Sequence, residues 1–160
     1  MPTFTHFDEQ GRVRMVDVSD KPVTAREAVA QGVITMQPET FDLISKEKIK
    51  KGNVLETARI AGIMAAKRTA DMIPMCHLLP ITHIKVDFFP QPDTHSIRIE
   101  VVVRAIDRTG VEMEALTAVS IVALTIYDMC KSYDRGMAIS DICLLKKSGG
   151  KSGAFVRKSS

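Results

Sequence analysis

The sequence contains no tryptophan, and aromatic residues make up only 5% of its 160 residues. Proteins that bind RNA or single-stranded DNA usually combine a basic surface with aromatic side chains on which the bases stack. Such a protein would also show strongly salt-dependent affinity for oligonucleotides. The shortage of aromatic side chains makes this class of function the least favoured, and we expect no nucleic-acid partner.

Cysteine is also scarce in the sequence. The three cysteines, Cys76, Cys130 and Cys143, are an odd number and form no C-x-x-C pair, which indicates a reducing compartment and no disulfide framework. The first residues show no cationic segment followed by an apolar one, so we expect no secretory signal. No uncharged apolar run reaches the roughly 20 residues that a transmembrane helix needs. These absences predict a cytoplasmic protein that does not span a membrane.

Acidic residues are absent after Leu145, where the chain carries five basic residues among several glycines. Without these five, the net charge of +3 changes sign, because 17 basic residues then stand against 19 acidic ones. Residues 145–153 resemble the phosphate-binding P-loop, but that motif requires a glycine where Leu145 stands, which disfavours a Walker-type NTPase. The segment is either a flap that closes over the phosphates of a small anion or a solvated basic tail.

Apolar periodicity predicts the order strand, helix, strand, strand, helix, strand, with one additional short helix. Strands are predicted at residues 25–36, 83–88, 97–104 and 137–145, and helices at residues 38–45, 53–72 and 111–132. This order is typical of an α+β fold of the ferredoxin-like type, with an antiparallel sheet and two long helices packed on one face. We expect a single domain over residues 1–160, in which residues 1–21 and 148–160 are mobile.

The helix predicted at residues 111–132 has no charged residue between Glu114 and Asp128. A helix this apolar must be buried, so its ionisable groups lie at the two ends of a helix that is shielded from water, where pKa values shift. Asp128 and Lys131 are three residues apart and can form either an ordinary salt bridge or an acid–base pair with a partly buried lysine. Glu112 and Glu114 are either functional carboxylates or ordinary carboxylates at the start of a helix, where the helix dipole favours negative charge.

Two further observations bear on whether copies of the chain associate. Glu114 and Asp128 are about 21 Å apart at about 1.5 Å per residue, so they serve one site only if the ligand is elongated or if neighbouring subunits complete each other's sites. The helix predicted at residues 53–72 has a second apolar side at Ile60 and Ile63, which indicates another packing partner such as a second subunit.

The turn at residues 74–80 contains Cys76 and His77 side by side. A zinc site needs more ligands at recognisable spacing, so we expect no metal site. His77 is either a hydrogen-bonding group for a substrate or a structural histidine.

Several long motifs in order resemble the molybdenum cofactor biosynthesis protein C family, the cyclic pyranopterin monophosphate synthases. The motifs are KGNVLETARIAG at 51–62, AAKRT at 65–69, IPMCH at 73–77, TGVEMEALTA at 109–118, ALTIYDMCK at 123–131 and KSGGKSG at 147–153. The resemblance covers nearly the whole chain from Met15 to Gly153, and the length of the motifs makes it specific.

The resemblance implies a lyase of molybdenum cofactor biosynthesis. Its substrate would be (8S)-3',8-cyclo-7,8-dihydroguanosine 5'-triphosphate, the cyclised dihydro-GTP made by a radical SAM enzyme, and its products would be cyclic pyranopterin monophosphate and diphosphate. It also implies a ferredoxin-like fold, a homohexamer built as a trimer of dimers with sites at subunit interfaces, and no metal or organic cofactor.

The family's functional residues carry over by position. Asp128 and Lys131 would be catalytic, together with Lys51 from across an interface. The residues expected to bind the substrate are Met75, Cys76, His77, Glu112, Met113, Glu114, Arg26, Lys67 and Lys147. Met75 stands where leucine is usual in the family, a substitution of similar volume. The alternative to a lyase is a non-catalytic nucleotide-sensing module on the same fold.

Overall fold

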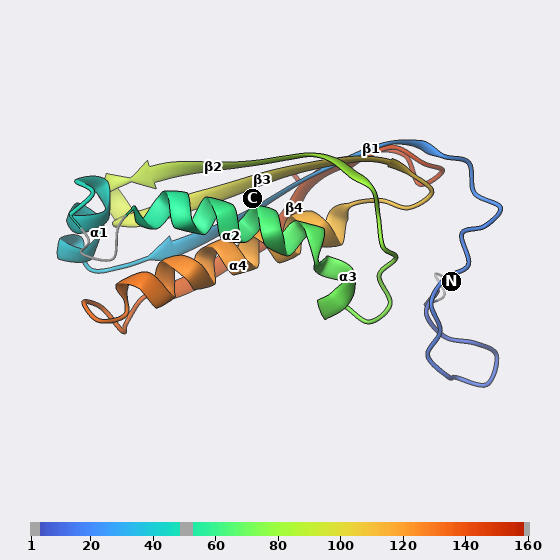
Figure 1. The fold of residues 1–160 in the computed structure, drawn as a ribbon, viewed down its shortest axis with the longest axis horizontal. Helices are drawn as coiled ribbons and strands as arrows, with labels where there is room; N and C mark the ends of the chain where they lie inside the picture. The colour runs from blue at the N-terminus through green and yellow to red at the C-terminus, as the bar shows by residue number, and fades with distance from the viewer. Residues whose placement is uncertain (1–3, 49–52, 159–160) are drawn as a thin grey trace.

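The computed structural model describes residues 4–48 and 53–158, which form a five-stranded sheet with helices on one side (Figure 1). All neighbouring strands are antiparallel, in the order β2-β3-β1-β4-β5. The strands are β1 (Thr24–Thr35), β2 (Ile81–Gln91), β3 (Ser96–Asp107), β4 (Ala138–Ser148) and β5 (Phe155–Val156). The helices are α1 (Pro38–Ser45), α2 (Val54–Lys67), α3 (Thr69–Met72) and α4 (Glu112–Cys130), with a 3-10 turn η1 (Pro92–Thr94) between β2 and β3.

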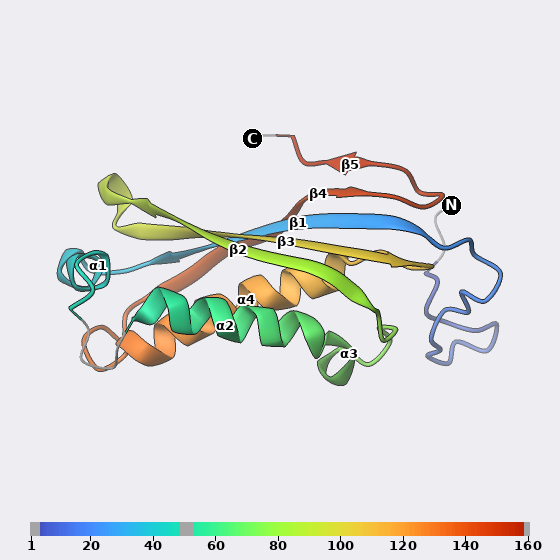
Figure 2. The same ribbon diagram turned by 45° about the horizontal axis from the view of Figure 1, so that its top comes forward.

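The two long helices, α2 and α4, lie side by side against the same face of the sheet, and α1 lies at one end of it (Figures 1 and 2). The predicted ferredoxin-like α+β architecture is therefore confirmed. The β2–β3 hairpin and the short helix at residues 38–45 also match the prediction. β2 and β3 extend beyond both predicted ends, β4 ends three residues later than predicted, and β1 is shifted by one residue.

Strict alternation in β3 determines which face of the sheet the helices cover. Ile97, Ile99, Val101, Val103 and Ala105 are buried under α2 and α4, because side chains two residues apart share a face. The intervening residues lie on the open face, where Glu27 of β1 forms ion pairs with both neighbouring strands, with Arg104 of β3 at 2.7 Å and with Lys146 of β4 at 3.0 Å. On the same face, Arg98 pairs with Glu100 within β3 at 2.8 Å.

The helices α2 and α4 run in opposite directions and touch closely at Gly62 (Figure 1). A Cβ atom at Gly62 would overlap Val122 Cγ2 and lie 3.5 Å from the carbonyl oxygen of Ala118. Glycine at this point lets the two backbones approach. Because the helices are antiparallel, the end of α2 lies at the same end of the molecule as the start of α4.

The single helix predicted at residues 53–72 is wrong in one respect, because the chain breaks it at Arg68 into α2 and α3. The buried hydroxyl of Thr69 donates to the carbonyl oxygens of Ala65 and Ala66, both at 3.1 Å. A threonine hydroxyl that donates to carbonyl groups of the preceding turn competes with the helical hydrogen bonds. The start is as expected: the Asn53 side chain accepts a hydrogen bond from Glu56 N at 3.0 Å, a typical N-cap.

The sequence predicted that no apolar run is long enough to span a membrane, and helix α4 departs from this expectation. It has 19 residues and, by length and composition alone, is long and apolar enough to cross a membrane. However, half of its most apolar stretch is buried inside the fold, and a core helix passes the same test. Its contacts with the sheet and with α2 identify α4 as the central core helix, with Ala118, Val119 and Val122 fully buried.

Candidate functional site

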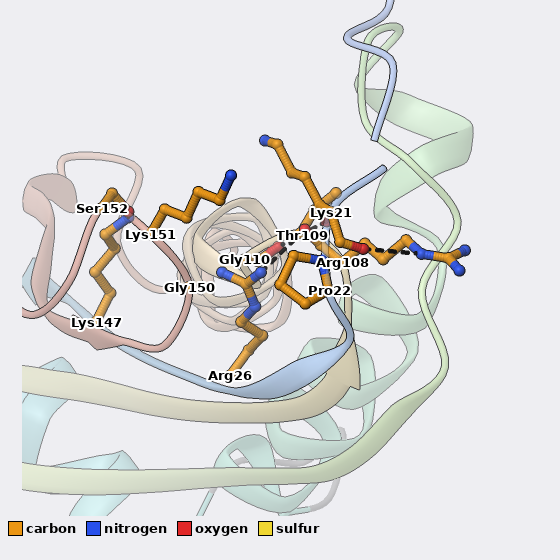
Figure 3. Close-up of a pocket in the computed structure, with 10 residues that line it drawn as sticks. All are labelled: Lys21, Pro22, Arg26, Arg108, Thr109, Gly110, Lys147, Gly150, Lys151 and Ser152. Carbon is orange, nitrogen blue, oxygen red and sulfur yellow. Dashed lines mark hydrogen bonds between the residues drawn. The ribbon is translucent and has the colours of Figure 1, made fainter. Parts of the chain in front are cut away.

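A basic cavity of about 400 Å³ opens at the end of the molecule where β1 and α4 begin (Figure 3). Among the described residues that line it, none is acidic; they are Lys21, Pro22, Arg26, Arg108, Thr109, Gly110, Lys147, Gly150, Lys151 and Ser152. The side chain of Arg108 points away from the cavity, and its Nε donates to the Lys21 carbonyl oxygen at 3.2 Å. The remaining cations suit the binding of a polyanion.

Strand pairing assembles this cavity from distant parts of the chain. Residue Arg26 of β1 pairs with Ala105 of β3, and the nearby residue Ala28 pairs with Lys147 of β4. Arg26 consequently lies beside the end of β3, where its Nε donates to the Asp107 carbonyl oxygen at 3.3 Å and its Nη2 to the Arg108 carbonyl oxygen at 3.0 Å. These two bonds fix the plane of the guanidinium.

Lys147 connects the cavity to the first turn of α4. Its Nζ lies 3.1 Å from Glu112 Oε1 and donates to Ser152 Oγ at 2.7 Å. The side chains of Lys147 and Glu112 are only 23% and 27% exposed, so their attraction is less screened than that of a surface pair. The position of Glu112 at the start of a helix also favours its negative charge.

Glu114, two residues further along α4, is a buried carboxyl group. Burial raises its pKa from 4.5 to about 7; a hydrogen bond from its own backbone opposes the rise, and the nearby Glu112 carboxylate adds to it. The side chain is thus poised to exchange a proton near neutral pH, which is what general acid–base chemistry requires. The expectation that the ends of the apolar helix hold shifted pKa values is confirmed for Glu114.

The turn between α3 and β2 packs beside Glu114. Burial, and then the negative charge of Glu114, raise the pKa of the Cys76 thiol. Cys76 therefore stays protonated and is not an activated nucleophile. His77 Nε2 lies 2.7 Å from the Val16 carbonyl oxygen; because a carbonyl can only accept, Nε2 carries the proton in this bond. Within the described residues, no group of three His, Cys, Asp or Glu side chains is arranged to hold a metal ion.

The structure thus gathers the predicted substrate-binding residues at one end of the protomer. Arg26 and Lys147 line the cavity, Glu112 contacts Lys147, and Glu114 neighbours Cys76. In the sequence, Met113 lies between the two glutamates, and Met75 and His77 flank Cys76. Lys67 is the last residue of α2, and α2 ends at this same end of the molecule (Figure 1). Sequence reasoning did not assign Lys21 and Lys151, which also line the cavity. The glycine-rich motif that contains Lys151 could have identified it, whereas no sequence pattern marks Lys21.

The predicted catalytic pair lies at the opposite end of α4. Lys131 Nζ donates to Asp128 Oδ1 at 2.6 Å, and the two side chains are 51% and 65% exposed. The expected partly buried lysine is therefore half exposed in a single protomer, although the neighbouring Met129 and Cys130 are buried. Lys51 lies outside the described residues. Asp128 and Glu114 are about 21 Å apart along the helix, so one protomer does not bring the two groups of residues together.

The chain is similar to known proteins along almost its full length. It is 65% identical over 98% of its length to the cyclic pyranopterin monophosphate synthase of Desulforapulum autotrophicum, covering 96% of that protein. It is 63% identical to the protein of the same name from Desulfatibacillum aliphaticivorans, with 99% of both chains covered. A similar protein of that name from Parvibaculum lavamentivorans is 58% identical, with 96% of both chains covered.

A solved structure of a mutant of the ferredoxin protease FusC in complex with Arabidopsis ferredoxin matches with a TM-score of only 0.31 and 14% identity, covering 66% of this chain and 10% of that one; a likeness this low supports no conclusion. The family model described as the MoaC family matches residues 15–150, which include Arg26, Lys147, both glutamates and the Asp128–Lys131 pair. This match and the relatives at 58–65% identity establish that the chain belongs to the MoaC family.

Proposed function

We propose that this protein is a cyclic pyranopterin monophosphate synthase. It converts (8S)-3',8-cyclo-7,8-dihydroguanosine 5'-triphosphate to cyclic pyranopterin monophosphate and diphosphate. The observation that carries the proposal is full-length identity of up to 65% to relatives bearing this name, which favours an enzyme over a nucleotide-sensing module. The basic cavity beside a buried carboxyl supports the proposal independently, because the reaction releases a polyanion and requires proton transfers.

The cavity residues act on the triphosphate end of the substrate. Departing diphosphate develops negative charge, which Arg26, Lys147 and Lys151 stabilise by charge-assisted hydrogen bonds. Glu114 exchanges a proton with the ring system, since burial keeps it protonated to near pH 7. Cys76 and His77, with Met75 and Met113, line the side of the site next to Glu114.

Asp128 and Lys131 complete the site from a neighbouring copy, because they lie at the far end of α4 in their own protomer. Lys51, which precedes α2, acts with them. The active assembly is a cytoplasmic homohexamer, a trimer of dimers, with sites at subunit interfaces. The outer side of α2 supports a second packing partner, because Ile60 and Met64 are 59% and 47% exposed, whereas Ile63 packs partly against the core.

Turnover of the cyclised nucleotide tests the proposal directly. The purified protein, incubated without added metal, is expected to form cyclic pyranopterin monophosphate and diphosphate, detected by mass spectrometry. Asp128→Ala and Lys131→Ala are expected to abolish product while keeping the melting temperature within a few degrees, since an exposed ion pair contributes about 0–1 kcal/mol. Full activity in both variants would remove them from the mechanism, and binding without product would favour the sensing module.

Mixing two inactive variants tests whether sites are shared between copies. In a dimer of Arg26→Ala with Asp128→Ala, one of the two shared sites has both residues intact. After random reassembly of equal amounts, about a quarter of the wild-type activity should return. If each protomer instead builds its own site, the mixture stays inactive. Two copies of the same variant, mixed in the same way, serve as the control.

A further inference from the structure

We propose that Gly150 is a positioning residue for the anion site, because its backbone packs against the guanidinium of Arg26 and holds one face of that group toward the cavity. The ligand that this arrangement serves is a linear polyphosphate chain. The inference rests on the proposed function only in assigning that chain to the substrate.

Three nitrogens of Arg26 have different surroundings. Nε and Nη2 donate to the carbonyl oxygens of Asp107 and Arg108. Within the described part of the chain, Nη1 donates no hydrogen bond. The guanidinium is thus fixed along one edge by the end of β3, and Nη1 remains available to bind an acceptor in the cavity. Figure 3 shows this guanidinium in the cavity, between the loop at residues 147–152 and the segment at residues 108–110.

The loop that follows β4 covers the guanidinium from the other side. A Cβ atom at Gly150 would overlap Nη1 and lie 2.7 Å from Cζ and 3.0 Å from Nη2. A Cβ atom at Gly149 would overlap the Ala25 carbonyl oxygen and lie 2.9 Å from Arg26 Cδ. The chain therefore passes over Arg26 with room for hydrogen atoms only, a close approach that glycine permits.

The backbone conformation of the loop requires glycine as well. Gly149 and Gly150 have φ values of +98° and +75°, a region that residues with a Cβ rarely adopt. The hydrogen bond from Lys147 Nζ to Ser152 Oγ at 2.7 Å closes the loop. Because the loop is closed and Arg26 is a flexible side chain, a methyl group at position 150 displaces the guanidinium.

Gly153 provides a matched control in the same segment. Its φ is +69°, close to that of Gly150, but a Cβ atom there would meet no heavy atom within 4 Å. Alanine at position 153 therefore introduces a similar backbone strain without touching Arg26. Any difference between the two alanine variants reports contact with the guanidinium and not the cost of a positive φ.

Titration calorimetry with inorganic triphosphate, at fixed ionic strength, tests the inference on the full-length protein. Gly150→Ala is expected to raise the Kd about tenfold or more, the typical loss for a hydrogen bond to a charged group, and Gly153→Ala to change it less than about twofold. Adding Gly150→Ala to Arg26→Ala is expected to weaken binding no further, because both changes remove the same contact. With the cyclised nucleotide, Gly150→Ala should raise KM and also lower kcat, because Arg26 stabilises the charge that develops on the departing diphosphate.

Three results would overturn the inference: equal Kd values for Gly150→Ala and Gly153→Ala, an additive loss in the Arg26→Ala background, or no binding of triphosphate by the unaltered protein. Failure of the proposed function is distinguishable from these results. In that case triphosphate still binds and depends on Gly150 and Arg26, but the cyclised nucleotide yields no product.

Discussion

Glu114 allows a thermodynamic test of the site, because its buried carboxyl titrates far from the usual range. Its pKa is about 7 in the folded protein, against an ordinary value of 4.5. Between these two pH values the unfolded chain has released the proton that the folded protein still holds, so the free energy of unfolding falls as pH rises. The contribution is fully present below about pH 4.5, and its loss is complete above about pH 7; at about 1.4 kcal/mol per pKa unit it amounts to about 3 kcal/mol.

Glu114→Gln removes this titration and keeps a side chain of similar size. The free energy of unfolding should be measured by urea denaturation at about pH 5 and about pH 8, at one fixed protein concentration because subunit association adds to stability. Between these pH values the unaltered protein is expected to lose about 2–3 kcal/mol more than the variant. Glu56→Gln is the control, since Glu56 also lies in the first turn of a helix but its side chain is 55% exposed.

A parallel change in the free energy of unfolding of the unaltered protein and of Glu114→Gln, within about 0.5 kcal/mol between the two pH values, would refute this prediction. Glu114 would then titrate as an ordinary carboxyl in the folded protein. Its assignment as a proton carrier near neutral pH would fail with it, while the role of the basic cavity would stand.

Two further predictions concern stability alone. Gly62→Ala is expected to cost about 1–3 kcal/mol by forcing α2 away from Val122, and Val122→Ala in the same chain should recover part of this loss in thermal denaturation; a neutral Gly62→Ala would contradict the close packing. Asp134→Ala is expected to cost about 2 kcal/mol in urea denaturation, because the buried Asp134 accepts hydrogen bonds from Gln37 N at 2.8 Å and Gly136 N at 2.9 Å. Its control is Asp42→Ala, which removes an exposed carboxylate and should change stability by less than about 0.5 kcal/mol.

Side-chain periodicity predicted the sheet and the long helices because the fold buries one face of each. The alternation of β3 and the uncharged run of α4 each carry the burial pattern directly in the sequence. The break at Arg68 has no such signal, since it depends on Thr69 turning its hydroxyl back to the preceding carbonyls. The two residues of β5 were also missed, because a short edge strand depends on its pairing with β4.

The candidate site was predictable in its chemistry but not in its geometry. Motif resemblance supplied Arg26, Lys147 and the two glutamates, and the structure places them together. The packing of Gly150 on Arg26 was not predictable, because it depends on the pairing of β1 with β4 across most of the chain. The exposure of Lys131 likewise depends on which elements cover the end of α4, and local spacing does not encode that.

The pairing of β1 with β4 has a consequence for the order of events during synthesis. These neighbouring strands are separated by about one hundred residues of chain, and closing a loop this long is slow and entropically costly. A nascent chain that has emerged only as far as α4 contains β1, β2, β3 and both long helices, yet it lacks Lys147 and the glycines that cover Arg26. The anion cavity therefore cannot form until β4 and the glycine-rich loop have been synthesised, by which point all other strands of the four-stranded core and both long helices are already present in the nascent chain.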